Sequence, residues 1–327
     1  MGIMKYFFYF FIFCFYNLVL AQQTEYVDFK SAKANIAFGD LNKHEVIGKV
    51  TYDFKILKNI DSIFIDAVGM TFDDVSLGEA IILHSSDGEK LWLNHQFKKD
   101  SSYQVSFTYK VHPNKALYFI DWDYENGNKQ IWTQGQGKYT SNWLPSIDDM
   151  NDKIEFDLTI TFDKNYEVIA NGTLINKQVN DSTITWYYDM QKPMSSYLVA
   201  LAIGNYAKKI EYTKSGIPLE MYYYPEDSLN FEPTYRYSKQ MFDFLEEEIG
   251  MPYPWQNYRQ VPVKDFLYAG MENTSTTIFA DTYVVDSIAY NDRNYITVNA
   301  HELAHQWFGD LVTETSGTHH WLHEGFA

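Results

Sequence analysis

Alternation of apolar and polar residues, with a period of two, dominates the chain from about residue 25 to residue 207. Successive side chains of a β-strand point to opposite faces of a sheet, so this period indicates strands that are buried on one face. Turn clusters such as SSDGEK, ENGNK and NDS separate these strands, and no long helical pattern interrupts them. We therefore predict an antiparallel β-domain over residues 22–207. The clearest alternating runs are Val50, Tyr52, Phe54 and Ile56; Val105, Phe107, Tyr109 and Val111; and Ile154, Phe156, Leu158, Ile160 and Phe162.

Beyond residue 207 the apolar period becomes that of a helix, which predicts a second domain over residues 208–327. A first helix is predicted between Pro233 and Ile249, and Gly250 is expected to end it. A β-like stretch follows at residues 261–279, and a second helix is predicted at about residues 293–308. One face of the first helix is expected to carry Tyr237, Met241, Phe244, Leu245 and Ile249.

The first 21 residues have the pattern of a secretory signal peptide. Lys5 precedes the apolar run YFFYFFIFCFYNLVL, and small residues end just before Gln22. The run is shorter than the ~20 residues that a membrane-spanning helix needs, so an uncleaved anchor is only the alternative interpretation. We expect an exported protein, secreted or periplasmic, with membrane attachment as an alternative. Cleavage would remove Cys14, the only cysteine, so any metal site must use histidine and carboxylate ligands.

The net charge of the chain limits the kinds of molecule that it can bind. The chain carries 26 Lys and Arg residues against 43 Asp and Glu residues, a net charge of −17. Such a surface repels nucleic-acid phosphates and anionic lipid headgroups. Nucleic acid is therefore not expected as a partner, no specific membrane lipid is inferred, and the sequence does not indicate an oligomeric state.

The stretch NAHELAHQWFGD, residues 299–310, holds two histidines four positions apart. On a helix such residues project from the same face, so His301 and His305 can bind one cation, a geometry that suits zinc. Glu302 is then placed to take a proton from a metal-bound water. The alternative interpretation is a surface helix with two solvated histidines.

Glu324 favours the metal site over that alternative. It follows His305 after eighteen intervening residues, in the segment WLHEGFA. Two histidines and one glutamate leave the fourth position of a tetrahedral zinc ion open for water, as a hydrolytic site requires. Taken alone, Glu324 is an ordinary acid near the end of the sequence.

These blocks, with three others, resemble one known family. They are HELAHQWFGD and WLHEGFA, AGMEN at residues 269–273, WTQGQG at residues 132–137 and WLPSIDD at residues 143–149. In order and spacing they are similar to the gluzincin aminopeptidases, peptidase family M1, which includes aminopeptidase N and leukotriene hydrolase. The resemblance implies a multidomain fold: an N-terminal, saddle-like antiparallel β-domain followed by a partial, thermolysin-like zinc-metallopeptidase domain.

Carried over by position, the resemblance implies one bound Zn²⁺ and a general base that deprotonates the zinc-activated water. It also implies an anion that binds the free α-amino group of a peptide substrate and so limits cleavage to the N-terminal peptide bond. The backbone beside that anion would bond the substrate as an edge strand. The implied residues are His301, His305 and Glu324 as zinc ligands; Glu302 as general base; Glu272, with Gln136 as a second group, for the amine; and Ala269, Gly270, Met271 and Asn273 in the same substrate-binding block as Glu272.

Three positions depart from the family pattern. Gln136 stands where many members have glutamate, as in the leukotriene hydrolase and aminopeptidase B branch, so Glu272 is expected to carry most of the charge toward the amine. The alternative for Gln136 is a plain turn residue in a Gly-rich loop. Ala269 replaces a usual glycine. His323 replaces a usual asparagine. With His319 and His320 nearby, an additional metal contact is conceivable, although solvated surface histidines are expected there.

The family's catalytic domain continues past the third ligand, to a tyrosine that stabilises the tetrahedral oxyanion and to a helical C-terminal domain. We therefore interpret the sequence as a C-terminally truncated fragment in which Glu324 lacks support, and we expect the polypeptide alone to be poorly active or inactive. The predicted function is a zinc-dependent aminopeptidase acting on peptides with a free N-terminus. The alternative is a truncated, non-catalytic module that binds peptide N-termini.

Overall fold

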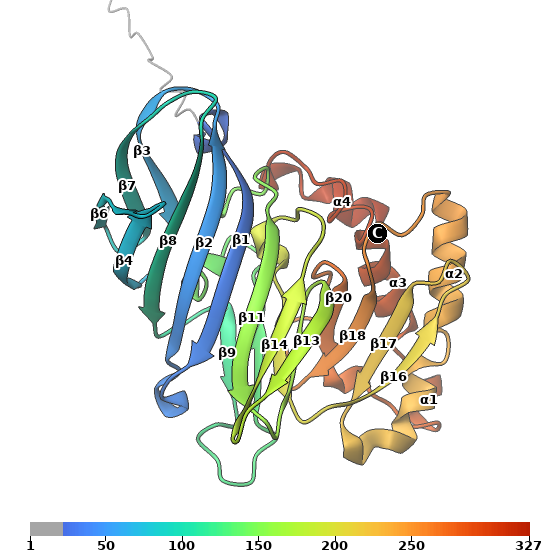
Figure 1. Cartoon of the computed structure of the whole chain (residues 1–327). Helices are drawn as coiled ribbons and strands as arrows, with labels where there is room; N and C mark the ends of the chain where they lie inside the picture. Colours follow the sequence, from blue (N-terminus) through green and yellow to red (C-terminus); the bar gives the residue numbers. More distant parts are fainter. Residues whose placement is uncertain (1–21) are drawn as a thin grey trace, which may run out of the picture.

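The computed structural model describes residues 22–327, and the predicted signal peptide lies outside that range. The β-rich first part and the mixed second part lie side by side, with the helices gathered on the second (Figure 1). This order confirms the predicted fold class of a mostly β N-terminal domain followed by a mixed region. Between residues 22 and 327, no helix has both the length and the apolar character needed to cross a membrane.

An eight-stranded sheet forms the larger layer of the first part. Its strands pair in the order β13-β14-β11-β1-β2-β8-β4-β5. The predicted alternation is confirmed in β2, β8 and β11, where every second residue is buried. The strands are β1 Val27–Phe38, β2 Val46–Ile56, β4 Thr71–Leu77, β5 Ala80–Ile81, β8 Ser102–Val111, β11 Glu155–Asp163, β13 Thr173–Val179 and β14 Thr183–Asp189.

One pair in this sheet departs from the predicted antiparallel pattern. Strands β1 and β11 are parallel, with Ala34 opposite Leu158. Neighbouring strands joined by short turns must run antiparallel, whereas more than a hundred residues separate β1 from β11, and such a long connection allows the parallel direction.

Two smaller sheets complete the first part. One has the order β12-β15-β10-β9 and the other the order β3-β7-β6. Strand β10 contains the first two residues of the segment WTQGQG, so the four-stranded sheet positions the loop that carries Gln136. The strands are β3 Ile60–Asp66, β6 Leu83–Ser86, β7 Lys90–Phe97, β9 Leu117–Ile120, β10 Gln130–Thr133, β12 Glu167–Ala170 and β15 Leu201–Gly204.

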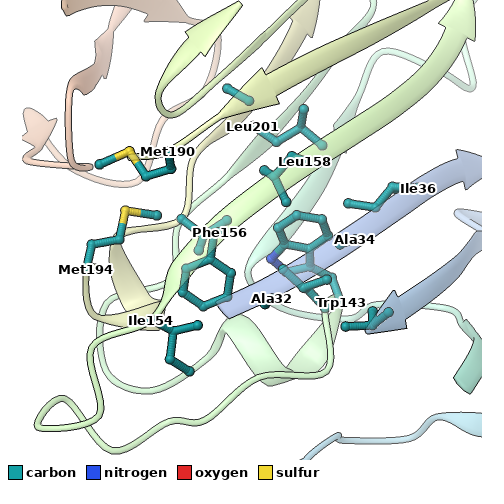
Figure 2. Close-up of a cluster of buried hydrophobic side chains, with 14 of the residues drawn as sticks. Ala32, Ala34, Ile36, Trp143, Ile154, Phe156, Leu158, Met190, Met194 and Leu201 are labelled. Atoms are coloured by element: carbon teal, nitrogen blue, oxygen red, sulfur yellow. The ribbon is translucent and has the colours of Figure 1, made fainter. Parts of the chain in front are cut away.

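The core of the first part lies beneath β1 and β11. Trp143, from the WLPSIDD segment, is fully buried there against the inward side chains of both strands (Figure 2). Leu201 of β15 and two methionines close the cluster, so one core joins the eight-stranded and four-stranded sheets. The residues labelled in the figure are Ala32, Ala34, Ile36, Trp143, Ile154, Phe156, Leu158, Met190, Met194 and Leu201.

The second part is a mixed five-stranded sheet with helices packed against it. Strands pair in the order β16-β17-β18-β20-β19, and the two central pairings, β17 with β18 and β18 with β20, are parallel. The strands are β16 Ala207–Tyr212, β17 Pro218–Tyr223, β18 Tyr258–Val263, β19 Gly270–Met271 and β20 Thr276–Ala280. The helices are α1 Phe231–Tyr235, α2 Ser238–Ile249, α3 Ile296–His305 and α4 Trp321–Phe326.

The predicted buried face of the first helix is wrong in part. Helix α2 ends at Gly250, which has a φ of +69°, as expected. However, Phe242 is the buried aromatic residue of α2, whereas Phe244 is 60% exposed and Tyr237 is 43% exposed. Phe242 packs among Tyr253, Tyr258 and Trp307, which all lie outside α2, so the helical period alone could not select it.

The second predicted helix is shorter than expected. Helix α3 covers Ile296–His305, and the chain turns at Gln306 to Gly309 instead of continuing the helix to Phe308. Gly309 has a φ of +142°, a conformation that favours glycine, and Asp310 then bonds back to the carbonyl of His305. The HExxH motif therefore occupies the last turns of α3.

Candidate metal centre

Helix α3 brings the two histidines of the HExxH motif together. The Nε2 atoms of His301 and His305 lie 3.1 Å apart, and their rings meet at 81°. The side chain of His305 is 1% exposed and that of His301 is 37% exposed. The pair therefore presents two nitrogen atoms toward one point at the margin of the protein interior.

Glu324 reaches the same point from helix α4, which packs against α3 (Figure 1). Its Oε2 atom lies 3.5 Å from Nε2 of His301 and 3.7 Å from Nε2 of His305. Zinc bonds of about 2.0–2.1 Å in a tetrahedral arrangement place ligand atoms roughly 3.3 Å apart. The three atoms therefore fit a tetrahedral zinc ion, and hydrogen bonding to His301 and His305 holds the pKa of Glu324 well below its usual range.

Neighbouring groups orient two of these ligands. Nδ1 of His305 lies 3.0 Å from the carbonyl oxygen of Phe308, so it donates its proton there and leaves Nε2 for a metal. The prediction that Glu324 lacks support is wrong. His320 stands four residues before Glu324, and its Nε2 atom lies 3.2 Å from the second carboxylate oxygen, Oε1.

Glu302 is buried beside the three ligands. Its side chain belongs to the same helix and is enclosed by strand β19. Burial raises the pKa of Glu302 well above its usual range, and the negative charge of Glu272 adds to the rise. A divalent cation held by the adjacent ligands would oppose this rise, because it favours the ionised carboxylate.

Gly270 fixes the distance between β19 and the Glu302 carboxylate. A Cβ atom built on Gly270 would lie 2.4 Å from Oε1 of Glu302, closer than real contacts allow. The backbone of β19 can therefore approach the carboxylate only because residue 270 has no side chain.

The segment AGMEN runs along the edge of the five-stranded sheet. Gly270 and Met271 form β19, which among residues 22–327 pairs with β20 alone and so leaves its other side open there. The carbonyl oxygen of Ala269 accepts a hydrogen bond from the backbone of Ala280. The sheet thus places an edge strand next to the metal ligands, where the sequence predicts the substrate-binding segment.

Glu272 and Asn273 follow this edge strand and are buried. Glu272 is 3% exposed, and its Oε1 atom has no hydrogen-bond partner within residues 22–327. The side-chain nitrogen of Asn273 donates to the carbonyl oxygen of Leu198 at 3.3 Å. An unpartnered buried carboxylate oxygen is costly, so Glu272 is suited to bind a cation or a donor from a ligand.

Gln136 comes to the centre from the first part of the chain. Its side-chain nitrogen lies 3.2 Å from Nε2 of His320, and its backbone N–H donates to Gln134. It lines a cavity of about 350 Å³ that lies between the two parts. The cavity walls are formed by Gln136, Gly137, Lys138, Asp148, Met150, Tyr197, Gly317 and His320.

The three additional histidines have different surroundings. His319 is exposed, as expected for a surface histidine. The same expectation is wrong for His323, which is 3% exposed and lies against Glu314, and His320 is only half-buried. Glu314 comes from the loop before α4, and because nothing in the sequence links a loop acid to a histidine nine positions later, the burial of His323 could not be predicted.

Gln306 is a site residue that the sequence reasoning missed. Its side-chain nitrogen donates to the carbonyl oxygen of Glu272 at 2.9 Å, and its Oε1 accepts from the backbone N–H of Ser275 at 2.7 Å. Gln306 thus ties the end of helix α3 to the loop that carries Glu272. Its only signal in the sequence is that a polar residue directly follows His305, within an otherwise buried stretch.

Comparison with known proteins finds two matching domains. Residues 25–198 match the peptidase M1 N-terminal domain, and residues 234–327 match the peptidase family M1 domain. Human glutamyl aminopeptidase is 32% identical over 56% of this chain and 20% of its own length. Leucine aminopeptidase 2 of Yarrowia lipolytica is 28% identical over 93% of this chain and 47% of its own length. Leucyl aminopeptidase of Saccharolobus solfataricus is 27% identical over 88% of this chain and 38% of its own length.

The chain thus spans less than half the length of these curated relatives. The two matched domains follow one another in the order of the β-rich and mixed parts of the structure. The second match contains the HExxH helix and Glu324. These matches place the chain in peptidase family M1.

Proposed function

We propose that this chain supplies the zinc ligands, the general base and the amine-binding group of a zinc-dependent aminopeptidase. The observation that carries the proposal is the convergence of three ligand atoms from two helices, 3.1–3.7 Å apart, beside the unpartnered buried carboxylate of Glu272. Relatives named as aminopeptidases support the same activity.

His301, His305 and Glu324 would hold the zinc ion. Zinc in such a site acts as a Lewis acid and lowers the pKa of water to near neutrality. Glu302 accepts the proton of the attacking water and passes it to the leaving amine, a role that suits a carboxylate in an enclosed site. Gly270 leaves room for the Glu302 side chain between helix α3 and strand β19.

Glu272 would bind the α-amino group of the peptide. The free side of β19 can pair with the main chain of the first substrate residues, and Glu272 follows β19 directly. An ammonium group bound by Glu272 then places the first peptide carbonyl near the metal ligands. Gln136 and the cavity beside it are suited to receive the amine and the first side chain from the opposite wall.

Two conservative variants test these roles, compared in a form of the protein whose wild type hydrolyses the substrate. The Glu302→Gln variant should keep zinc but lose at least about a hundredfold in hydrolysis of an aminoacyl-arylamide, because it has no base. The Glu272→Gln variant should mainly raise KM for substrates with a free amine. Glu248→Gln, on the exposed side of α2, is the matched control. Unchanged hydrolysis by Glu302→Gln would refute the proposed mechanism.

The activity of the polypeptide alone is a separate proposal. We expect residues 22–327 loaded with zinc to turn over an aminoacyl-arylamide slowly or not at all, and turnover close to that of a complete relative would contradict this. Binding of peptides without cleavage would favour the peptide-binding module.

Export is likewise proposed, and N-terminal sequencing of the exported protein should find Gln22 first.

A further inference from the structure

A second group of side chains that could bind a metal lies next to His301, His305 and Glu324. Glu314, His320 and His323, called here the second cluster, each offer one ligand atom, and these atoms lie within 4.8 Å of one another. Nδ1 of His320 lies 3.0 Å from Oε1 of Glu314, and Nδ1 of His323 contacts Oε2 of Glu314. The cluster therefore repeats the composition of the first ligand set, two histidines and one glutamate.

One ring nitrogen of the second cluster is not satisfied by hydrogen bonds. His323 is 3% exposed, and its Nε2 atom lacks a hydrogen-bond partner within residues 22–327. Its Nδ1 atom and Oε2 of Glu314 contact each other, and the Glu314 side chain is fully buried. Buried polar atoms in proteins are nearly always paired, so the free Nε2 atom of His323 indicates a missing partner.

The charge of the cluster indicates what that partner is. A buried carboxylate requires a nearby cation, and in the described part of the chain Glu314 forms ion pairs with histidines only. Imidazole nitrogens with a carboxylate oxygen are the ligands that zinc and similar transition metals prefer. Because Glu314 faces the Nδ1 atoms of both rings, the Nε2 atoms are left to bind a divalent cation, whose charge Glu314 would help to balance.

Glu324 connects the two ligand sets. Its Oε2 atom faces His301 and His305, while its Oε1 atom lies 3.2 Å from Nε2 of His320 and 3.9 Å from Nε2 of His323. A carboxylate can bind one cation through each oxygen. We propose that His320 and His323 of the second cluster bind a second divalent transition-metal ion through their Nε2 atoms, with Oε1 of Glu324 as the third ligand, so that Glu324 is shared between the two sites.

This second ion would change how the amine side of the site works. His320 belongs to the second cluster and also contacts Gln136 at 3.2 Å. A cation held there would repel an ammonium group placed beside Gln136. Zinc in excess is therefore expected to compete with peptide binding on this wall of the site. The second site shares Glu324 with the proposed zinc site but rests on different histidines, so the two can be tested separately.

Metal content of the purified chain tests the proposal. The chain is stripped with a chelator, titrated with zinc chloride alone, freed of unbound metal and analysed by mass spectrometry. Two zinc ions per chain are expected. The variant His301→Ala/His305→Ala should keep one, and His320→Ala/His323→Ala should also keep one. His319→Ala, an exposed neighbour, is the matched control and should keep two.

The remaining outcomes are equally decisive. One zinc per wild-type chain, lost entirely in His301→Ala/His305→Ala, would overturn the second site and leave the proposed zinc site intact. One zinc that survives this variant but is lost in His320→Ala/His323→Ala would support the second cluster and overturn the first set. Two zinc ions retained in His320→Ala/His323→Ala would place the second ion elsewhere and overturn the proposal. The wild-type stoichiometry needs no variant to fold, and Glu314→Gln offers a milder change.

Discussion

At the scale of single residues, the site depends on residue 270 being a glycine, which has no side chain. Gly270 lets the backbone of β19 lie against the carboxylate of Glu302, so the strand forms one wall of the base's pocket. Any other residue there must displace either the strand or the carboxylate. Because catalysis by a general base requires it to lie within hydrogen-bond reach of the proton it takes, even a small displacement is expected to matter.

Gly270→Ala should therefore reduce hydrolysis without removing zinc. The added methyl group would lie 2.4 Å from Oε1 of Glu302, and kcat/KM for an aminoacyl-arylamide should fall roughly 10- to 100-fold. Gly325→Ala is the control, because its methyl group would meet no atom within 4 Å. Equal kcat/KM values for wild type and Gly270→Ala would show that the close approach has no catalytic importance.

Asp152 is a second residue with a testable role, because its surroundings should make the free energy of unfolding depend on pH. It lies just before β11, it is 5% exposed, and burial, with the nearby charge of Asp28, raises the pKa of its carboxyl to about 8. A carboxyl group whose pKa is higher in the folded than in the unfolded state binds more protons when folded. The free energy of unfolding should therefore decrease as the pH rises from about 4 to about 8.

Asp152→Asn should remove this pH dependence. The variant should be more stable than wild type above pH 8, by at most about 6 kcal/mol, and the difference should shrink toward pH 4. Urea unfolding at several pH values measures it, with Asp181→Asn in an exposed turn as control. A variant that is less stable than wild type at pH 9 would contradict the prediction.

At the scale of elements, helix α3 is held by polar contacts at both ends of the motif. Asn299 bonds to Gln260 of β18 and donates to Ser238 of α2 at 3.2 Å. Gln306, just past the helix, bonds to the loop that carries Glu272. The helix is therefore fixed in rotation and in position along its axis, which keeps His301 and His305 aligned with the edge strand.

Gln306→Ala should loosen that connection. It would leave the buried N–H of Ser275 and the carbonyl oxygen of Glu272 unpaired, which costs roughly 1–3 kcal/mol for each group. We expect a lower melting temperature and a raised KM for peptides with a free amine. Gln178→Ala, at an exposed position of β13, is the control. A lower melting temperature with unchanged KM would show that Gln306 stabilises the fold but does not position Glu272.

The elements differ in how far the sequence could predict them. Strands β2, β8 and β11 were predictable because each alternates strictly between a buried and an exposed face. The HExxH pair was predictable because four-residue spacing on a helix is a local property. The burial of Phe242 and the contact of His323 with Glu314 depend on segments that only the tertiary structure brings together.

At the scale of the whole molecule, Arg259 links the β-rich part to the five-stranded sheet. It is 2% exposed and donates to the carbonyl oxygens of Ala170 and Gly172, at 2.8 and 2.6 Å, and to Glu220 at 3.1 Å. Burial alone would raise the pKa of Glu220, but the charges of Arg259 and Lys208 lower it to about 2. One cation therefore satisfies acceptors from both parts.

Arg259→Met should destabilise the whole chain. Glu220 would lose its fully buried partner, and breaking a buried ion pair costs about 3–5 kcal/mol. Urea unfolding should show a lower midpoint, and the two parts should lose their joint transition. Arg236→Met, at the exposed ion pair with Glu232, should leave the midpoint nearly unchanged. Equal midpoints for the two variants would show that Arg259 does not hold the parts together.

Because β19 is short, the site would respond to the distance between the amine of a peptide and its first carbonyl. Only Gly270 and Met271 separate the start of the strand from Glu272, so an amine bound by Glu272 and a main chain paired with β19 leave no freedom in register. The site would then select peptides by the number of backbone atoms between the amine and the first carbonyl, and not by their side chains. A peptide that begins with a β-amino acid carries one extra backbone carbon, about 1.5 Å, and its first carbonyl would overshoot the metal. Such a peptide should bind through its amine and yet resist cleavage.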